Sequence, residues 1–125
     1  MESMQKKRIL AVDDEEDLIE ALTLRLQASD YEVIHAFDGR EALHKAKGES
    51  PDLIILDIML PFLDGFEICR LLKFDSKFSN IPIIMLTSKV SELDKQTGMG
   101  VGADAYLTKP YDAKCLLEKI GELLN

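Results

Sequence analysis

The sequence of 125 residues predicts a single α/β domain with a (βα)5 plan, in which a doubly wound parallel sheet has helices on both faces. Two patterns carry this prediction. Apolar runs suited to strands alternate with amphipathic stretches suited to helices, and the connections are short. Three of the apolar runs are continuous, as expected for strands that are covered on both faces. Right-handed crossovers then follow from the alternation.

The expected strands are short runs rich in Ile, Leu and Val. Turns that contain Pro51 and Pro82 open the third and fourth strands. We expect strands at residues 8–12, 31–36, 53–56, 83–86 and 105–108.

The expected helices carry apolar residues on one face. In the first helix, Leu18, Leu22 and Leu26 recur at steps of four residues. The fourth helix is the weakest, because Gly98 and Gly100 each cost it about 1 kcal/mol relative to Ala. We expect helices at residues 15–28, 39–47, 66–74, 91–100 and 113–124.

Composition favours one globular domain, since 46% of the residues are hydrophobic and 30% are charged. We expect residues 1–7 to form a basic tail and residues 8–125 to form the domain. No apolar run approaches the roughly 20 residues of a membrane span, and the first one is too short for a signal peptide. A cytoplasmic protein without membrane contact is expected. The net charge of −8 disfavours direct nucleic-acid binding by this domain.

Polar residues suited to phosphate and metal chemistry follow four of the strands. Asp13 and Asp14 follow the first strand, and Asp57 follows the third. Thr87 and Lys109 follow the fourth and fifth. The carboxyl ends of parallel strands share one edge of the sheet, where ligands bind. Three carboxylates, a hydroxyl and an ammonium group should therefore converge at one place.

This constellation indicates phosphoryl transfer. Crowded carboxylates raise one another's proton affinity unless a cation intervenes, and Mg²⁺ suits such a site. Asp13 or Asp14 could instead be a helix N-cap, which leaves the second acid unexplained. Asp57 is the candidate nucleophile for an acyl phosphate, with Lys109 and Thr87 stabilising the phosphoryl oxygens. A cis bond between Lys109 and Pro110 would aim the lysine inward.

These motifs resemble the receiver domain of two-component response regulators, in the CheY-like superfamily. The resemblance covers about residues 8–124 and rests on five motifs in order. They are Val12-Asp13-Asp14-Glu15, Asp57, Pro61 with Gly65, Leu86-Thr87-Ser88, and residues 102–110 ending in Lys109-Pro110. It implies a flavodoxin-like fold with strand order 2-1-3-4-5.

The resemblance also implies a function as a phosphorylation-activated switch in a phosphorelay. Asp57 would accept a phosphoryl group from a sensor histidine kinase or a phosphotransfer protein. Asp14 and Asp57 would ligate Mg²⁺ directly, with the backbone carbonyl of Met59, and Asp13 would act through water. Mn²⁺ is an alternative ion. Such a domain would catalyse only its own phosphorylation and dephosphorylation, so it is not an enzyme in the usual sense.

Further roles follow from the same resemblance. Lys109 would contact the phosphoryl group, while Thr87 and Tyr106 would move as the switch. The altered face, at residues 91–100, 105–108 and 113–124, would control an output partner or an attached effector domain, as in transcription regulators, and could form a homodimer. Tyr111 is expected to be an exposed aromatic on the surface that meets the phosphodonor.

The resemblance also implies that two positions, Met59 and Lys89, influence the lifetime of the acyl phosphate. Met59 cannot orient an attacking water, and its bulk could shield the phosphorus. We therefore expect the phosphorylated form to last longer than in relatives with a polar residue there. Lys89 is expected to point to solvent.

Two other classes of protein fit less well. A phosphatase-like hydrolase with an aspartyl nucleophile, of the haloacid dehalogenase type, requires D-x-D after the first strand, whereas residues 13–15 read D-x-E. A flavin carrier requires a phosphate loop rich in Ser and Thr there, and the acidic residues 13–17 would repel the phosphate.

Overall fold

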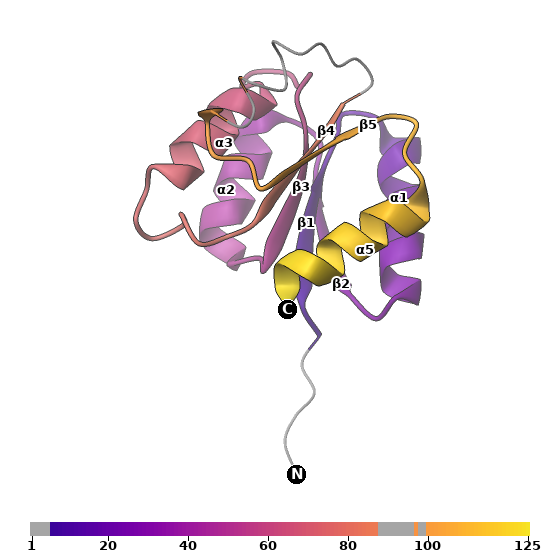
Figure 1. The fold of residues 1–125 in the computed structure, drawn as a ribbon. Helices are drawn as coiled ribbons and strands as arrows, with labels where there is room; N and C mark the ends of the chain where they lie inside the picture. The colour runs from indigo at the N-terminus through magenta and orange to yellow at the C-terminus, as the bar shows by residue number, and fades with distance from the viewer. Residues whose placement is uncertain (1–5, 88–96, 98–99) are drawn as a thin grey trace.

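The computed structural model describes residues 6–87, 97 and 100–125, and this part forms one parallel sheet in the order β2-β1-β3-β4-β5 (Figure 1). All four strand pairs are parallel, so the predicted sheet and its order are confirmed. Two strands run one residue further than predicted and include Asp57 and Thr87. The strands are β1 (Arg8–Val12), β2 (Glu32–Ala36), β3 (Leu53–Asp57), β4 (Ile83–Thr87) and β5 (Ala105–Thr108).

Helices cover both faces of the sheet, as predicted. In Figure 1, α2 and α3 lie on one side of the strands, and α1 and α5 lie on the other. The helix expected at residues 91–100 falls outside the described residues, apart from 97 and 100. Within the described residues, no helix is long and apolar enough to cross a membrane. The helices are α1 (Glu16–Ala28), α2 (Gly39–Glu49), α3 (Gly65–Lys73) and α5 (Ala113–Leu124).

Aspartate caps fix where three of the helices begin. Asp38, Asp64 and Asp112 each accept a hydrogen bond from a backbone N–H in the first turn of α2, α3 and α5. Such caps satisfy N–H groups that have no partner within the helix. The Asp64 cap explains why α3 begins at Gly65, one residue before the predicted start.

The core forms two layers because successive side chains of a strand point to opposite faces. From β1, Leu10 and Val12 join the layer under α2 and α3. Ile9 and Ala11 join the layer under α1 and α5. Every residue of β3 is buried. This double burial explains the continuous apolar runs and places the polar residues that follow them at one edge of the sheet.

Candidate functional site

Two buried aspartates lie side by side where β1 and β3 end. Asp13 is 5% exposed and Asp57 is 6% exposed, and they are the buried charged residues of the part that the structure describes. Asp14, the next residue along the chain, is exposed. The three aspartates each offer a carboxylate oxygen, and these oxygens lie within 4.8 Å of one another. The predicted convergence of three carboxylates is therefore present.

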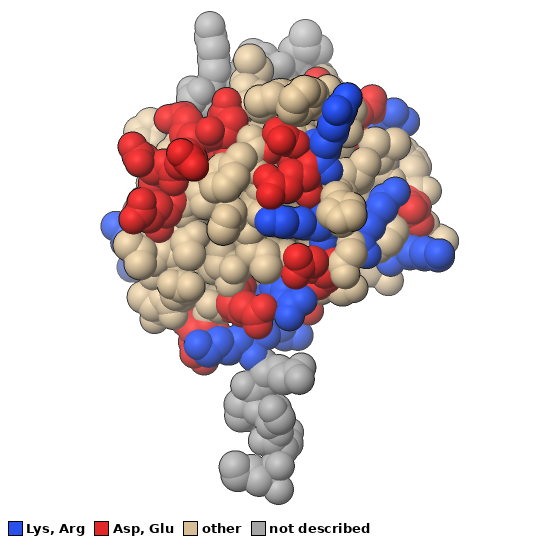
Figure 2. Space-filling view, turned by 180° about the vertical axis from the view of Figure 1, so that it is seen from behind, with Lys and Arg blue, Asp and Glu red and all other residues tan. Residues whose placement is uncertain are grey.

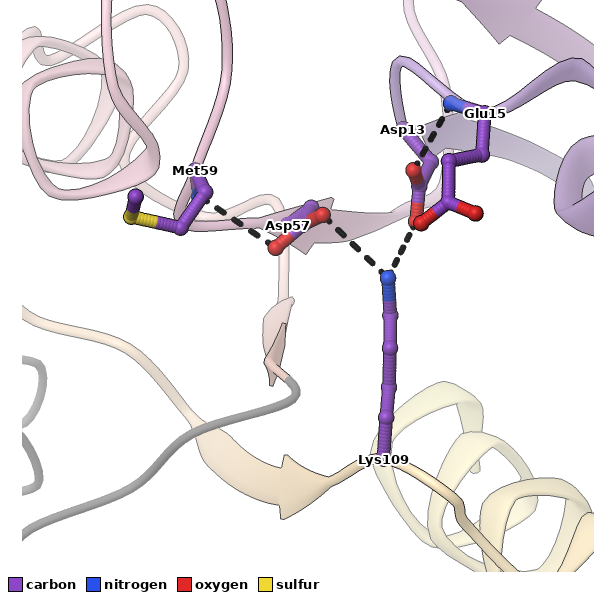
Figure 3. A network of polar contacts seen from close by, with 5 residues as sticks. All are labelled: Asp13, Glu15, Asp57, Met59 and Lys109. Carbon is purple, nitrogen blue, oxygen red and sulfur yellow. Dashed lines mark hydrogen bonds and ion pairs between the residues drawn. The ribbon is translucent and has the colours of Figure 1, made fainter.

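The local backbone orients both buried carboxylates in the same way. Asp13 Oδ1 accepts a hydrogen bond from the backbone N–H of Glu15 at 3.0 Å. Asp57 Oδ1 accepts one from the backbone N–H of Met59 at 3.3 Å. In both cases the aspartate side chain accepts a hydrogen bond from the backbone N–H two residues later, which is a common local arrangement of aspartate. The Oδ2 atoms are left to face the centre of the site (Figure 3).

Lys109 enters the site from the loop between β5 and α5. Its Nζ lies 2.5 Å from Asp13 Oδ2 and 3.2 Å from Asp57 Oδ2 (Figure 3). The side chain is only 12% exposed. The peptide bond between Lys109 and Pro110 is cis. The ammonium group therefore bridges the ends of β1 and β3.

The charges of the site are not balanced. Burial raises the pKa of Asp57, the Lys109 ammonium opposes this effect, and the Asp13 carboxylate adds to it. Burial alone would lower the pKa of Lys109, but the carboxylates of Asp13 and Asp57 outweigh burial and raise it, which keeps the lysine charged. Three clustered carboxylates thus share the site with one ammonium group, which contacts Asp13 and Asp57. An excess of negative oxygen donors is the setting that binds a hard divalent cation.

Gly65 lies at the site, although the sequence identified it only as part of the motif downstream of Asp57. A Cβ atom at Gly65 would lie 2.4 Å from the backbone oxygen of Asp57 and 2.8 Å from Ile58 Cα. Its N–H donates to the Ile58 carbonyl at 2.8 Å. The start of α3 thus packs directly on the backbone that carries Asp57. The spacing of Gly65 from Asp57 was the one available signal, and spacing alone could not reveal the contact.

The structure places the other predicted site residues less completely. Thr87 ends β4, one position beyond Leu86, which pairs with Asp57. The side chain of Thr87 and all of Lys89 lie outside what the structure describes. Met59 is 71% exposed, and its side chain extends away from Asp57 (Figure 3).

Two tyrosines on and after β5 differ in their surroundings. Tyr106 is half-buried and packs against the core layer under α2 and α3. Tyr111 was expected to be exposed, and this expectation is wrong. Its ring is half-buried against the layer under α1 and α5, and burial raises the pKa of its hydroxyl.

Comparisons with known proteins agree with this geometry. The chain is 48% identical over 119 residues to the alkaline phosphatase synthesis transcriptional regulatory protein PhoP of Bacillus subtilis, covering 95% of this chain and 49% of that protein. The chain therefore spans about half the length of that relative.

Two solved structures of related proteins are also similar to this chain in sequence and fold. The Vibrio cholerae chemotaxis protein CheY4 is 38% identical, with a TM-score of 0.89 over 96% of this chain and 100% of that one. A CheY-like receiver domain protein from Methanospirillum hungatei is 34% identical, with a TM-score of 0.90 over 96% of this chain and 94% of that one. The sequence model of the response regulator receiver domain family matches residues 9–121 of this chain. The chain belongs to the response regulator receiver domain family.

Proposed function

We propose that the chain is the phosphorylation-activated switch of a two-component phosphorelay, with Asp57 as the phosphoacceptor. One observation carries this proposal. The Asp57 carboxylate is buried beside Asp13 and lies 3.2 Å from the ammonium nitrogen of Lys109. A carboxylate held in this way is oriented to attack phosphorus, and the cation is placed to neutralise charge on the phosphoryl oxygens. Phosphoryl transfer depends mostly on such positioning.

In the proposed reaction, an oxygen of Asp57 forms a bond to the phosphorus of a phosphohistidine. The donor is a sensor histidine kinase or a phosphotransfer protein in the cytoplasm. The P–N bond breaks, its electron pair stays on the imidazole, and an acyl phosphate remains on Asp57. Water later attacks the phosphorus, which releases phosphate and restores the carboxylate. The chain promotes these two steps on itself and turns over no separate substrate.

Asp13, Asp14 and Asp57 are the residues that would hold a divalent cation. Their oxygens lie within 4.8 Å of one another, and an oxygen-only donor set suits Mg²⁺, with Mn²⁺ as an alternative. In this proposal Asp14 and Asp57 bind the ion directly, together with the Met59 carbonyl, and Asp13 acts through water. When bound, the ion would withdraw charge from the phosphoryl oxygens.

The proposed response to phosphorylation runs from Thr87 to the surface. The Thr87 hydroxyl donates to the phosphoryl group, and Tyr106 moves with it. This shifts the balance between two states of the face that includes β5 and α5. The same face is the proposed contact for a homodimer or an effector domain, since PhoP is a transcriptional regulatory protein about twice as long as this chain. Residues 8–125 would form the receiver domain and residues 1–7 a tail.

The phosphodonor has a groove beside the site in which to dock. The groove lies between α1 and the loop that follows β5. Lys109 and Tyr111 thus form part of both the site and the docking surface. The groove is lined by Glu15, Leu18, Arg25, Lys109, Pro110, Tyr111 and Ala113.

Intact mass after incubation with acetyl phosphate and Mg²⁺ tests the proposal directly. We expect one added phosphoryl group on the wild type, none on Asp57→Asn, and none when Mg²⁺ is chelated. Glu118→Gln, an exposed change on α5, is the matched control and should be phosphorylated like the wild type. Phosphorylation that persists in Asp57→Asn would show that another residue is the acceptor.

A further inference from the structure

A shallow groove lies on the opposite side of the molecule from α1, between α2 and the loop from β3 to α3. Leu43 and Leu63 contribute its apolar surface. Arg40, His44 and Lys47 contribute basic side chains, and no acidic residue lines it. The lining residues are Arg40, Leu43, His44, Lys47, Gly48 and Leu63.

The basic side chains of this groove stand out in a chain of net charge −8. Within the part of the chain that the structure describes, neither Arg40 nor Lys47 takes part in an ion pair, although Lys45 on the same helix pairs with Glu41 at 3.2 Å. Figure 2, seen from behind, shows acidic side chains gathered on the α1 side and basic ones spread over the α2 side. Within that part, no acidic side chain therefore neutralises Arg40 or Lys47, although the Lys47 ammonium lies 5.9 Å from the centroid of the Phe78 ring.

An exposed phenylalanine on the loop after β3 lies beside this groove, against Arg40. Phe62 is 69% exposed, and its ring centroid lies 4.7 Å from Arg40 Cζ, which is a cation–π distance. Its φ is +71°, and the backbone N–H of Leu63 donates to the Pro61 carbonyl at 2.9 Å, which closes a tight turn around Phe62. A bulky side chain is disfavoured at positive φ. The fold therefore holds a large apolar ring in solvent by means of a strained turn, and such outliers point to function.

We propose that Arg40, Lys47, Phe62 and the groove between Leu43 and Leu63 form a docking surface for an acidic protein segment that carries an apolar side chain. We call it the α2 docking surface. Carboxylates of the segment would pair with Arg40 and Lys47. The apolar side chain would cover the Phe62 ring and fill the groove. The surface does not depend on the role of Asp57.

Charge and shape favour a peptide over other anionic partners. The negative charge on the rest of the molecule would repel a long polyanion such as a nucleic acid, which needs an extended basic track. A short peptide would interact mainly with the nearby cations Arg40 and Lys47. Charges on the rest of the molecule that lie farther away than about 8 Å are largely screened at physiological salt. An apolar groove also leaves a phosphate backbone without contacts, whereas a leucine or phenylalanine would bury its surface there.

The first test is titration of the fluorescein-labelled peptide acetyl-Glu-Glu-Asp-Leu-Phe-Asp-Glu-amide, followed by fluorescence anisotropy. We expect binding that weakens by about tenfold in the double variant Arg40→Gln/Lys47→Gln, because two exposed ion pairs are lost. Lys114→Gln, an exposed change on α5, should bind like the wild type. The analogue with Gln and Asn in place of the acids should bind at least as weakly as the peptide binds to the double variant.

Phe62→Gly separates docking from folding. Glycine tolerates the positive φ, so this variant should melt at a higher temperature than the wild type. The same variant should bind the acidic peptide about fivefold more weakly, because the aromatic contact is gone. Phe74→Ala, which removes another exposed ring at the end of α3, is the matched control and should leave binding unchanged.

Several results would overturn the proposal. They are no binding of the acidic peptide, equal binding of its neutral analogue, equal effects of Lys114→Gln and the double variant, and unchanged binding in Phe62→Gly. A thymidine oligonucleotide or an anionic vesicle that binds through Arg40 and Lys47 more tightly than the peptide would assign the surface to those partners instead. Self-association by sedimentation that is lost in the double variant would assign it to a second copy of this chain.

Discussion

The carboxyl group of Asp57 is buried, and burial is unfavourable for its ionised form unless its neighbours compensate. Lys109 compensates in part, but the net effect of burial, Lys109 and Asp13 is a raised pKa. The folded state therefore binds the Asp57 proton more tightly than the unfolded state does. The stability gained from this proton is complete below the unfolded pKa, near 3.8, and is lost as the pH rises through the folded pKa. Above the folded pKa, the buried negative charge opposes folding relative to the protonated form.

Asp57→Asn should therefore stabilise the protein at about pH 7 by on the order of 1 kcal/mol, because it removes a buried charge. Urea denaturation of the two proteins at a series of pH values measures the effect. The advantage of the variant should shrink as the pH falls toward the unfolded pKa. A variant that is less stable than the wild type at neutral pH would show that Lys109 compensates the charge fully. Glu118→Gln should stay within about 0.5 kcal/mol of the wild type.

Met59 carries the prediction about the lifetime of the acyl phosphate. Its side chain is 71% exposed and extends away from Asp57 (Figure 3), so its bulk shields little in this structure. We expect Met59→Asn to speed dephosphorylation, since an amide can orient the attacking water. Met59→Ala should leave the rate within about twofold, because it adds no such group.

The decay of the phosphorylated mass over time measures both Met59 variants. An equal acceleration in Met59→Ala would mean that bulk at this position is what protects the acyl phosphate. No acceleration in Met59→Asn would contradict the prediction altogether.

At the level of elements, two side-chain contacts fix how β2 leads into α2. Asp38 caps α2 through Glu41 N–H at 2.8 Å, and Glu41 Oε1 accepts from Phe37 N–H at 2.8 Å. This backbone bond is the main cause of the lowered pKa of Glu41. Stability from Glu41 is therefore present above its unfolded pKa and is lost as the pH falls through the folded value. The pair fixes the end of β2 against the start of α2.

Two glycines give a matched pair of helix substitutions. Gly65→Ala should destabilise the protein by about 2 kcal/mol or more, because the new Cβ would meet the Asp57 backbone oxygen at 2.4 Å. Gly48→Ala should stabilise it by about 0.5–1 kcal/mol, because nothing lies within 4 Å of the new Cβ in α2. Thermal or urea unfolding measures both.

The phosphorylation rate with acetyl phosphate distinguishes the two glycine variants further. Gly65→Ala should also slow phosphorylation, since it displaces the backbone that carries Asp57. Gly48→Ala should not change it. If Gly65→Ala stays folded and is phosphorylated at the rate of the wild type, α3 does not position the acceptor.

At the scale of the whole molecule, a cation that binds only the folded state should raise its stability. An ion at ten times its dissociation constant adds about 1.4 kcal/mol, and the effect grows with concentration. We expect Mg²⁺ to raise the melting temperature of the wild type but not of Asp14→Asn. Asp14 is exposed, so this substitution removes a proposed ligand without disturbing the core.

Asp17→Asn, which changes an exposed acid in the first turn of α1, is the control and should keep the response to Mg²⁺. An equal response in wild type and Asp14→Asn would place the ion elsewhere. Equal responses to Mg²⁺ and to the same ionic strength of NaCl would indicate screening of the net charge of −8 instead of a bound ion.

The sequence by itself determined the fold class, the parallel sheet and the edge at which the aspartates meet. Hydrophobic periodicity reports local structure, and the carboxyl ends of parallel strands must share an edge. Strand order came from the resemblance and agrees with the structure. The observed ends of the helices and strands differ from the predicted ends by one or two residues. Helix caps such as Asp64 and the pairing of neighbouring strands decide these ends.

Only the tertiary structure decided which of these residues are buried and what they contact. The strand ends predicted that Lys109 lies near the aspartates, but not that its ammonium group bridges Asp13 and Asp57, which are 96 and 52 residues away in sequence. The same holds for Gly65, whose close packing on Asp57 depends on how α3 returns to the sheet. Tyr111 became half-buried because α1 and α5 close over it. Burial and charge compensation depend on segments brought together by folding, and periodicity within one segment does not determine them.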